Sequence, residues 1–123
     1  MRRLMVAGAL ALLVLPVAAQ AMTVDEFLAK AAALKAKGMA AALSPDLGLL
    51  RGEIKTAADA YRADIDADQA AGRKPRSCPP PKGQAKIDSN TLIGSFQTIP
   101  AGKRGVSVKT AFYSFMDKRY PCG

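Results

Sequence analysis

The chain contains two cysteines that lie far apart in the sequence. Cys78 precedes three consecutive prolines, and Cys122 follows Tyr120 and Pro121. Two thiols that reach an oxidising compartment are expected to pair with each other. The sequence therefore predicts one disulfide between Cys78 and Cys122, which closes a loop of about 45 residues and contributes on the order of 4 kcal/mol through chain entropy. A disulfide between two copies of the chain is the alternative.

The first 21 residues indicate export. Two arginines precede an uncharged apolar run over 4–17, and residues 19–21 (Ala-Gln-Ala) have the small side chains that a signal peptidase recognises. We expect cleavage before Met22 and a periplasmic domain over 22–123 with no stable membrane anchor. A retained membrane anchor is the alternative, but the apolar run of about 14 residues is shorter than the roughly 20 that span a bilayer.

The residue types that are present exclude most catalytic sites. The chain has no histidine, which excludes Ser-His-Asp and Cys-His catalysis and zinc sites built on histidine. A disulfide would also remove both thiolates. Asp64, Asp66 and Asp68 are spaced two apart, so they do not share one helix face, and we expect them on a solvated helix surface. We therefore predict a protein that is not an enzyme and that holds no metal and no cofactor.

Positive charge is concentrated in the second half of the predicted domain. Residues 22–72 carry 6 Lys/Arg and 8 Asp/Glu, whereas residues 73–123 carry 10 Lys/Arg and 2 Asp/Glu. A basic half of this kind favours an acidic partner or an anionic surface. Nucleic-acid binding is disfavoured by the predicted export and by the lack of aromatic residues interleaved with the basic ones.

Hydrophobic periodicity predicts an all-α, single-domain bundle of about four helices. Thr23 and Glu26 form a capping box that starts the first helix, and Gly38 ends it. A short apolar turn over 39–43 leads to Ser44, which caps a long second helix that ends at Gly72. The apolar stripes of these helices are Val24, Phe27, Leu28, Ala31 and Leu34 in the first, and Leu47, Leu50, Ile54, Ala57, Ala58, Tyr61 and Ile65 in the second.

Residues 73–87 are predicted to be a linker, because the consecutive prolines force an extended path. We expect a stiff connector, and a ligand for a partner module is the alternative. Asp88 or Ser89 can cap a third helix, and Ser107 can cap a fourth, with a basic loop over 100–105 between them. The apolar stripes are Leu92, Ile93, Phe96 and Ile99 in the third helix, and Val108, Ala111, Phe112, Phe115 and Met116 in the fourth.

A Cys-Pro-Pro motif, two short helices and a Tyr-Pro-Cys motif follow one another in an order that resembles the Rap/Tai family of immunity proteins. The matching stretch is roughly 61–122, and the matching residues are Cys78, Pro79, Pro80, Tyr120, Pro121 and Cys122. Proteins of that family are small, exported and helical, pair the two cysteines, and protect bacteria from effectors of the type VI secretion system. The best-known members bind and block peptidoglycan amidases in the periplasm, often as homodimers. The resemblance therefore implies an inhibitor of a cell-wall-hydrolase effector, with an amidase as the candidate effector and a homodimer as a candidate assembly.

Basic residues in the linker and in the loop are the candidate contacts with such a partner. The segments that bind effectors vary within the family, so no inhibitory residue carries over from it. A rigid loop could cover the active-site cleft of the effector, and positive charge would steer association with an acidic partner. One alternative is that these residues only solubilise the domain, and another is a basic periplasmic structural or envelope-binding protein without an effector partner. The candidate contacts are Arg76, Lys82 and Lys86 in the linker, and Lys103 and Arg104 in the loop.

Overall fold

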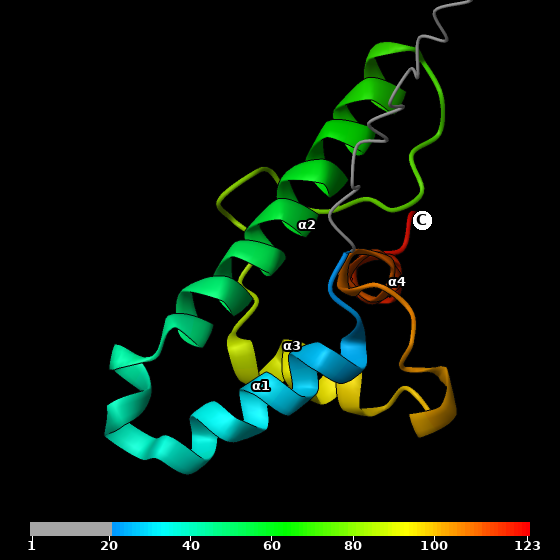
Figure 1. Ribbon diagram of the computed structural model, residues 1–123. Coiled ribbons are helices and arrows are strands. Elements are labelled where there is room, and N and C mark those ends of the chain that lie inside the picture. Colours follow the sequence, from blue (N-terminus) through cyan, green and yellow to red (C-terminus); the bar gives the residue numbers. More distant parts are fainter. Residues whose placement is uncertain (1–20) are drawn as a thin grey trace, which may run out of the picture.

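The structure is a computed structural model that describes residues 21–123. The predicted signal peptide lies, except for Ala21, outside the described residues. Within residues 21–123 the chain is all-α, with four α-helices, two short 3₁₀ helices and no β-strand, as predicted (Figure 1). The elements in chain order are α1 (Val24–Lys37), η1 (Gly38–Leu43), α2 (Pro45–Ala70), α3 (Ser89–Gln97), η2 (Ala101–Lys103) and α4 (Val108–Arg119).

Each α-helix begins at a side chain that the sequence marks as a cap. These side chains accept hydrogen bonds from backbone amides of the first helical turn, which have no partner within the helix. Asp88, one of the two candidates for the third helix, is the residue that caps it. The four capping contacts are Glu26 N to Thr23 Oγ1 at 3.2 Å, Asp46 N to Ser44 Oγ at 3.3 Å, Thr91 N to Asp88 Oδ1 at 2.7 Å and Thr110 N to Ser107 Oγ at 3.1 Å.

Two of the helices, α1 and α2, form the arms of a V (Figure 1). α1 and α2 diverge from the short η1 segment that joins them, and α4 lies at the open end of the V. The core forms where the four helices converge. There Phe27 of α1 meets Phe96 of α3 edge to face, with ring centroids 5.4 Å apart, and Tyr61 of α2 meets Phe112 of α4 in the same way at 6.0 Å. Aromatic pairs in this geometry add to the stabilisation that burial of apolar area provides.

Two long-range connections close the fold. The disulfide between Cys78 and Cys122 joins the linker to the end of α4 within one chain, with Cα atoms 4.9 Å apart, so the prediction of an internal disulfide is confirmed. At the other end of α4, Val24 N donates to Val106 O and Val108 N donates to Met22 O, each at 2.9 Å. Met22 is buried as a result, although it lies outside the predicted apolar stripes.

The turn between α1 and α2 is apolar, as predicted, and it adopts a 3₁₀ helix. Gly38 ends α1 with a φ of 58°, a left-handed conformation that a residue with a Cβ adopts only at a cost. Met39 and Leu43 then project from η1 into solvent, with 97% and 90% of their surface exposed. This turn is therefore the most exposed apolar part of the described chain.

Candidate functional site

A groove of about 620 Å³ lies between α1 and α2. Its volume falls in the range of about 300–1,000 Å³ that is typical of ligand sites in proteins. Most of its lining is apolar. Some of the lining residues, such as Leu34 and Leu50, are buried, and others, such as Leu47 and Ile54, are half-buried. The apolar lining includes Ala31 and Leu34 of α1, Leu47, Leu50, Ile54 and Ala58 of α2, Ile87 of the linker, and Leu92 and Ile93 of α3.

The polar residues around the groove carry more positive than negative charge. The carboxylate of Asp59 accepts a hydrogen bond from Lys55 Nζ at 2.6 Å, which lowers the pKa of Asp59, and the charge of Lys82 acts in the same direction. The other carboxylate of the lining, Asp88, caps α3 and is thereby engaged. The lining also contains Arg51, Arg62 and Lys82, which form no ion pair within the described residues. The groove therefore suits an apolar ligand or segment that carries negative charge at its edge.

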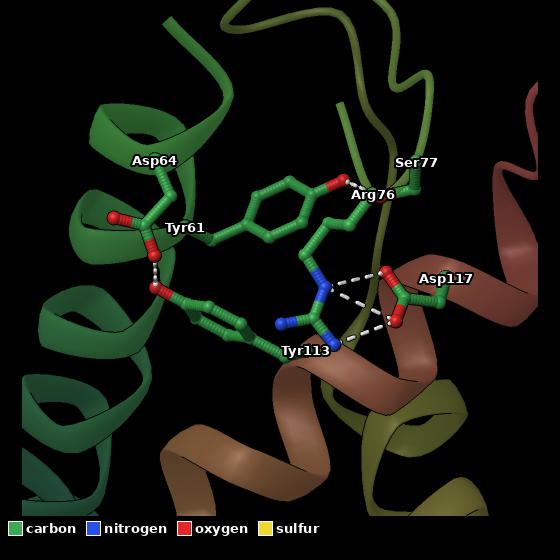
Figure 2. Close-up of polar contacts among 6 residues, drawn as sticks. All are labelled: Tyr61, Asp64, Arg76, Ser77, Tyr113 and Asp117. Carbon is green, nitrogen blue, oxygen red and sulfur yellow. Dashed lines mark hydrogen bonds and ion pairs between the residues drawn. The ribbon is translucent and has the colours of Figure 1, made fainter. Parts of the chain in front are cut away.

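A buried pair of hydroxyl groups also fixes α2 to the linker (Figure 2). Tyr61 of α2 and Ser77 of the linker are hydrogen-bonded through their hydroxyl oxygens, and Ser77 is completely buried. The next residue, Cys78, forms the disulfide, and its backbone amide donates to Tyr120 O at 2.8 Å. The Cys-Pro-Pro and Tyr-Pro-Cys motifs thus lie against each other at the end of α4.

Arg76 connects the same linker to α4 (Figure 2). Its guanidinium donates to both carboxylate oxygens of Asp117, with the shortest distance 2.7 Å between Nη2 and Oδ2. This hydrogen bonding raises the pKa of Arg76 above its ordinary value. The guanidinium also lies 4.8 Å from the centre of the Tyr113 ring, within the range of a cation–π contact. Arg76 is therefore engaged in holding the fold.

Tyr113 completes this network from the other side (Figure 2). Its hydroxyl donates to Asp64 Oδ2 at 2.7 Å, which joins α4 to α2. Burial raises the pKa of Tyr113 to about 12, and the hydrogen bond to Asp64 and the charge of that carboxylate act in the same direction. Asp64 is exposed on the surface of α2, as expected, and its carboxylate accepts this hydrogen bond as well. Asp68 likewise has an ion-pair partner, Arg73, at 3.1 Å, whereas Asp66 is exposed.

The five predicted contact residues lie in different surroundings. Arg104, like Arg76, is engaged internally, because its guanidinium donates to the carbonyl oxygens of Ile99 and Gln97 at 2.9 Å and so satisfies the end of α3. Lys82 lines the groove. Lys86 and Lys103 are exposed and belong to the linker and to η2. Of the five, only Lys82 belongs to the lining of the groove, so the structure does not gather the predicted residues into one site.

Neither a metal site nor a membrane span is found in the described part of the chain. Residues 21–123 contain no group of three or more cysteine, aspartate or glutamate side chains that could hold a metal ion. No helix in the same range is both long enough and apolar enough to cross a bilayer. What the geometry offers is a binding surface, which consists of the groove and its charged edge.

Comparison of the chain with protein-family models, with curated proteins and with solved structures gave no match.

Proposed function

We propose that this protein is an exported, non-catalytic binding protein of the immunity type that inhibits a cell-wall-hydrolase effector. The observation that carries the proposal is the apolar groove of about 620 Å³ with a positively charged edge. The resemblance of the two cysteine motifs to the Rap/Tai family suggests the class of partner. The meeting of these motifs at the disulfide is consistent with that resemblance.

The groove would receive an apolar segment of the effector, such as one face of a helix or the tip of a loop. Segments of this kind bind apolar grooves through a few large side chains at regular spacing. Arg51, Arg62 and Lys82 favour a segment that is flanked by acidic residues. The linker loop that carries Lys82 would then lie against the effector and block substrate access, which makes inhibition steric.

The experiment expresses hydrolases encoded near this gene in the periplasm of a host bacterium, with and without this protein. If the proposal is right, one hydrolase lyses the host only when this protein is absent, and the two proteins bind each other when purified. If no hydrolase is neutralised and none binds, the proposal fails. Salt-sensitive adhesion of the purified protein to anionic envelope material through its basic half would then support the envelope-binding alternative.

Two tryptophan substitutions on α1 test whether the groove is the contact. Ala31 lines the groove, whereas the adjacent Ala32 is exposed to solvent. Ala31→Trp should fill the groove and abolish neutralisation, while Ala32→Trp should leave it intact. Because the groove has room for the larger side chain, we expect Ala31→Trp to change the free energy of unfolding by less than about 1.5 kcal/mol. Neutralisation by the Ala31→Trp variant at the level of the original protein would exclude the groove as the contact.

A further inference from the structure

The η1 turn presents an apolar surface that the proposed inhibition does not use. All six of its residues are apolar or glycine, and Met39 and Leu43 are almost fully exposed. The turn lies at the joint of the V, away from α4 and the disulfide (Figure 1). An apolar surface that is exposed to this degree marks contact with another surface.

The surroundings of η1 are positively charged, although the half of the chain to which it belongs is acidic. Between Glu26 and Asp46 the sequence has three lysines and no acidic residue. One of them, Lys30, is neutralised by Asp46 at 3.2 Å. The other two, Lys35 and Lys37, are exposed in the last turn of α1 and form no ion pair within the described residues. Two apolar side chains therefore project from a turn that is flanked by two ammonium groups without an ion-pair partner, of which that of Lys37 donates to Ser44 Oγ at 3.4 Å.

We infer that η1 docks onto the surface of an anionic phospholipid bilayer. Met39 and Leu43 would enter the boundary between headgroups and acyl chains, and Lys35 and Lys37 would contact the lipid phosphates. This contact goes beyond the proposed inhibition of an effector and uses a different surface. It would hold the protein reversibly at the membrane with its groove open to the solvent.

Two observations favour a bilayer over a second copy of the chain. A stable protein interface usually involves about 20–30 residues on each side, far more than the few that η1 offers. A symmetric contact through η1 would also bring Lys35 and Lys37 of the two copies together, and like charges repel. A bilayer surface requires only shallow insertion of a few apolar side chains and attracts the lysines.

The test is flotation of the purified exported protein with lipid vesicles. Vesicles of phosphatidylcholine mixed with phosphatidylglycerol should bind the protein, and added salt should weaken the binding because it screens the lysines. Vesicles of phosphatidylcholine alone should bind it less. Met39→Ser combined with Leu43→Ser should lower the partition coefficient by about 100-fold, and Lys35→Gln combined with Lys37→Gln by about 30-fold on the mixed vesicles.

The matched controls change an exposed apolar residue and two lysines that lie outside η1 and α1. Val106 is 41% exposed near α4, and Val106→Ser should leave the partition coefficient unchanged. Lys82→Gln combined with Lys86→Gln removes two charges from the linker and should lower it much less than the change at Lys35 and Lys37. All variants share one N-terminus, so any contribution from that segment cancels in the comparison.

Three results would overturn the inference. Vesicle binding that is unchanged in the Met39/Leu43 variant would exclude insertion of η1. An equal loss of binding in the linker control would assign the contact to the basic half of the chain. A dimer that the Met39/Leu43 change dissociates, in sedimentation experiments without vesicles, would assign η1 to contact between copies if vesicle binding is unaffected. Hydrolase neutralisation is measured separately, so a failure here leaves the proposed function untouched.

Discussion

The two ends of this small domain are held together by different kinds of interaction. Around the linker and α4, which we call the stapled end, the disulfide and the Tyr61–Ser77, Tyr113–Asp64 and Arg76–Asp117 contacts join the linker, α2 and α4. Around α1 and η1, which we call the open end, α1 and α2 diverge and leave the groove and two exposed apolar side chains. The contacts between polar side chains there are the Lys30–Asp46 ion pair and a hydrogen bond from Lys37 to Ser44.

The difference shows how a domain of this size can expose an apolar groove and still fold. A small chain buries only part of its apolar surface, so its stability is marginal and each uncovered apolar residue reduces it further. The disulfide and the polar contacts of the stapled end stabilise the domain, and they offset the apolar surface that the open end leaves exposed. Parts of a protein with fewer buried contacts open more readily, so we expect the open end to exchange its backbone hydrogens faster than the stapled end.

Removal of the disulfide should reduce the difference in stability between the two ends more than any other change. Cys78→Ser combined with Cys122→Ser should lower the free energy of unfolding by about 2–5 kcal/mol, because the unfolded chain regains the entropy that the cross-link removes. Urea titration followed by circular dichroism measures the loss. Hydrogen exchange should show that protection in α4 falls toward the level of α1. If the amides of α4 stay better protected than those of α1, the difference between the two ends does not depend on the disulfide.

High pH offers a second way to weaken the stapled end. Because the pKa of Tyr113 is raised to about 12, the folded protein keeps this proton in a range where the unfolded chain, with an ordinary pKa near 10, has lost it. The contribution of Tyr113 to stability is therefore complete below about pH 10 and is lost as the pH rises to 12. Ultraviolet titration should show a tyrosine transition near pH 12 that is missing in Tyr113→Phe. A difference spectrum with its midpoint near pH 10 would contradict the burial of Tyr113 and its hydrogen bond to Asp64.

The smallest of the three effects concerns the buried hydroxyl pair. Tyr61→Phe should lower the free energy of unfolding by about 1–3 kcal/mol, because the Ser77 hydroxyl stays buried without a partner. Ser77→Ala should cost a similar amount, and the double variant should cost less than the sum of the two. Thermal unfolding of the four proteins gives this cycle. Additive effects would mean that the two hydroxyls do not depend on each other.

The helices and the disulfide could be predicted from the sequence because their signals are local or have few alternatives. Each helix start is marked by a capping residue, and each apolar stripe follows the helical period. Two cysteines in one chain leave only one internal pairing. The stripe of α2 also identified the residues that line the groove, such as Leu47 and Ile54. It could not show that they are only half-buried, because periodicity reports which face is apolar and not which neighbour covers it.

The surroundings of individual side chains were harder to predict. Arg76 and Arg104 belong to a basic segment and were candidates for partner contact, yet their guanidinium groups donate within the domain. Tyr113 and Ser77 were not singled out, although both are buried. Their partners lie in other elements, as with Asp64 for Tyr113, and a single sequence carries no signal for such a pairing. Ser77 precedes Cys78 in the sequence, but this position alone does not indicate that its hydroxyl is buried.

The short pairing of residues 22–24 with 106–108 has a consequence for when this protein can fold. The ribosome synthesises residues 22–24 more than 80 residues before their partners at 106–108. Until then Val24, which is fully buried in the final structure, has no α4 to pack against. Contacts between distant parts of a chain also form slowly. The apolar face of the first helix therefore stays uncovered until residues 106–119 have been made, and we expect a chain in that state to bind chaperones.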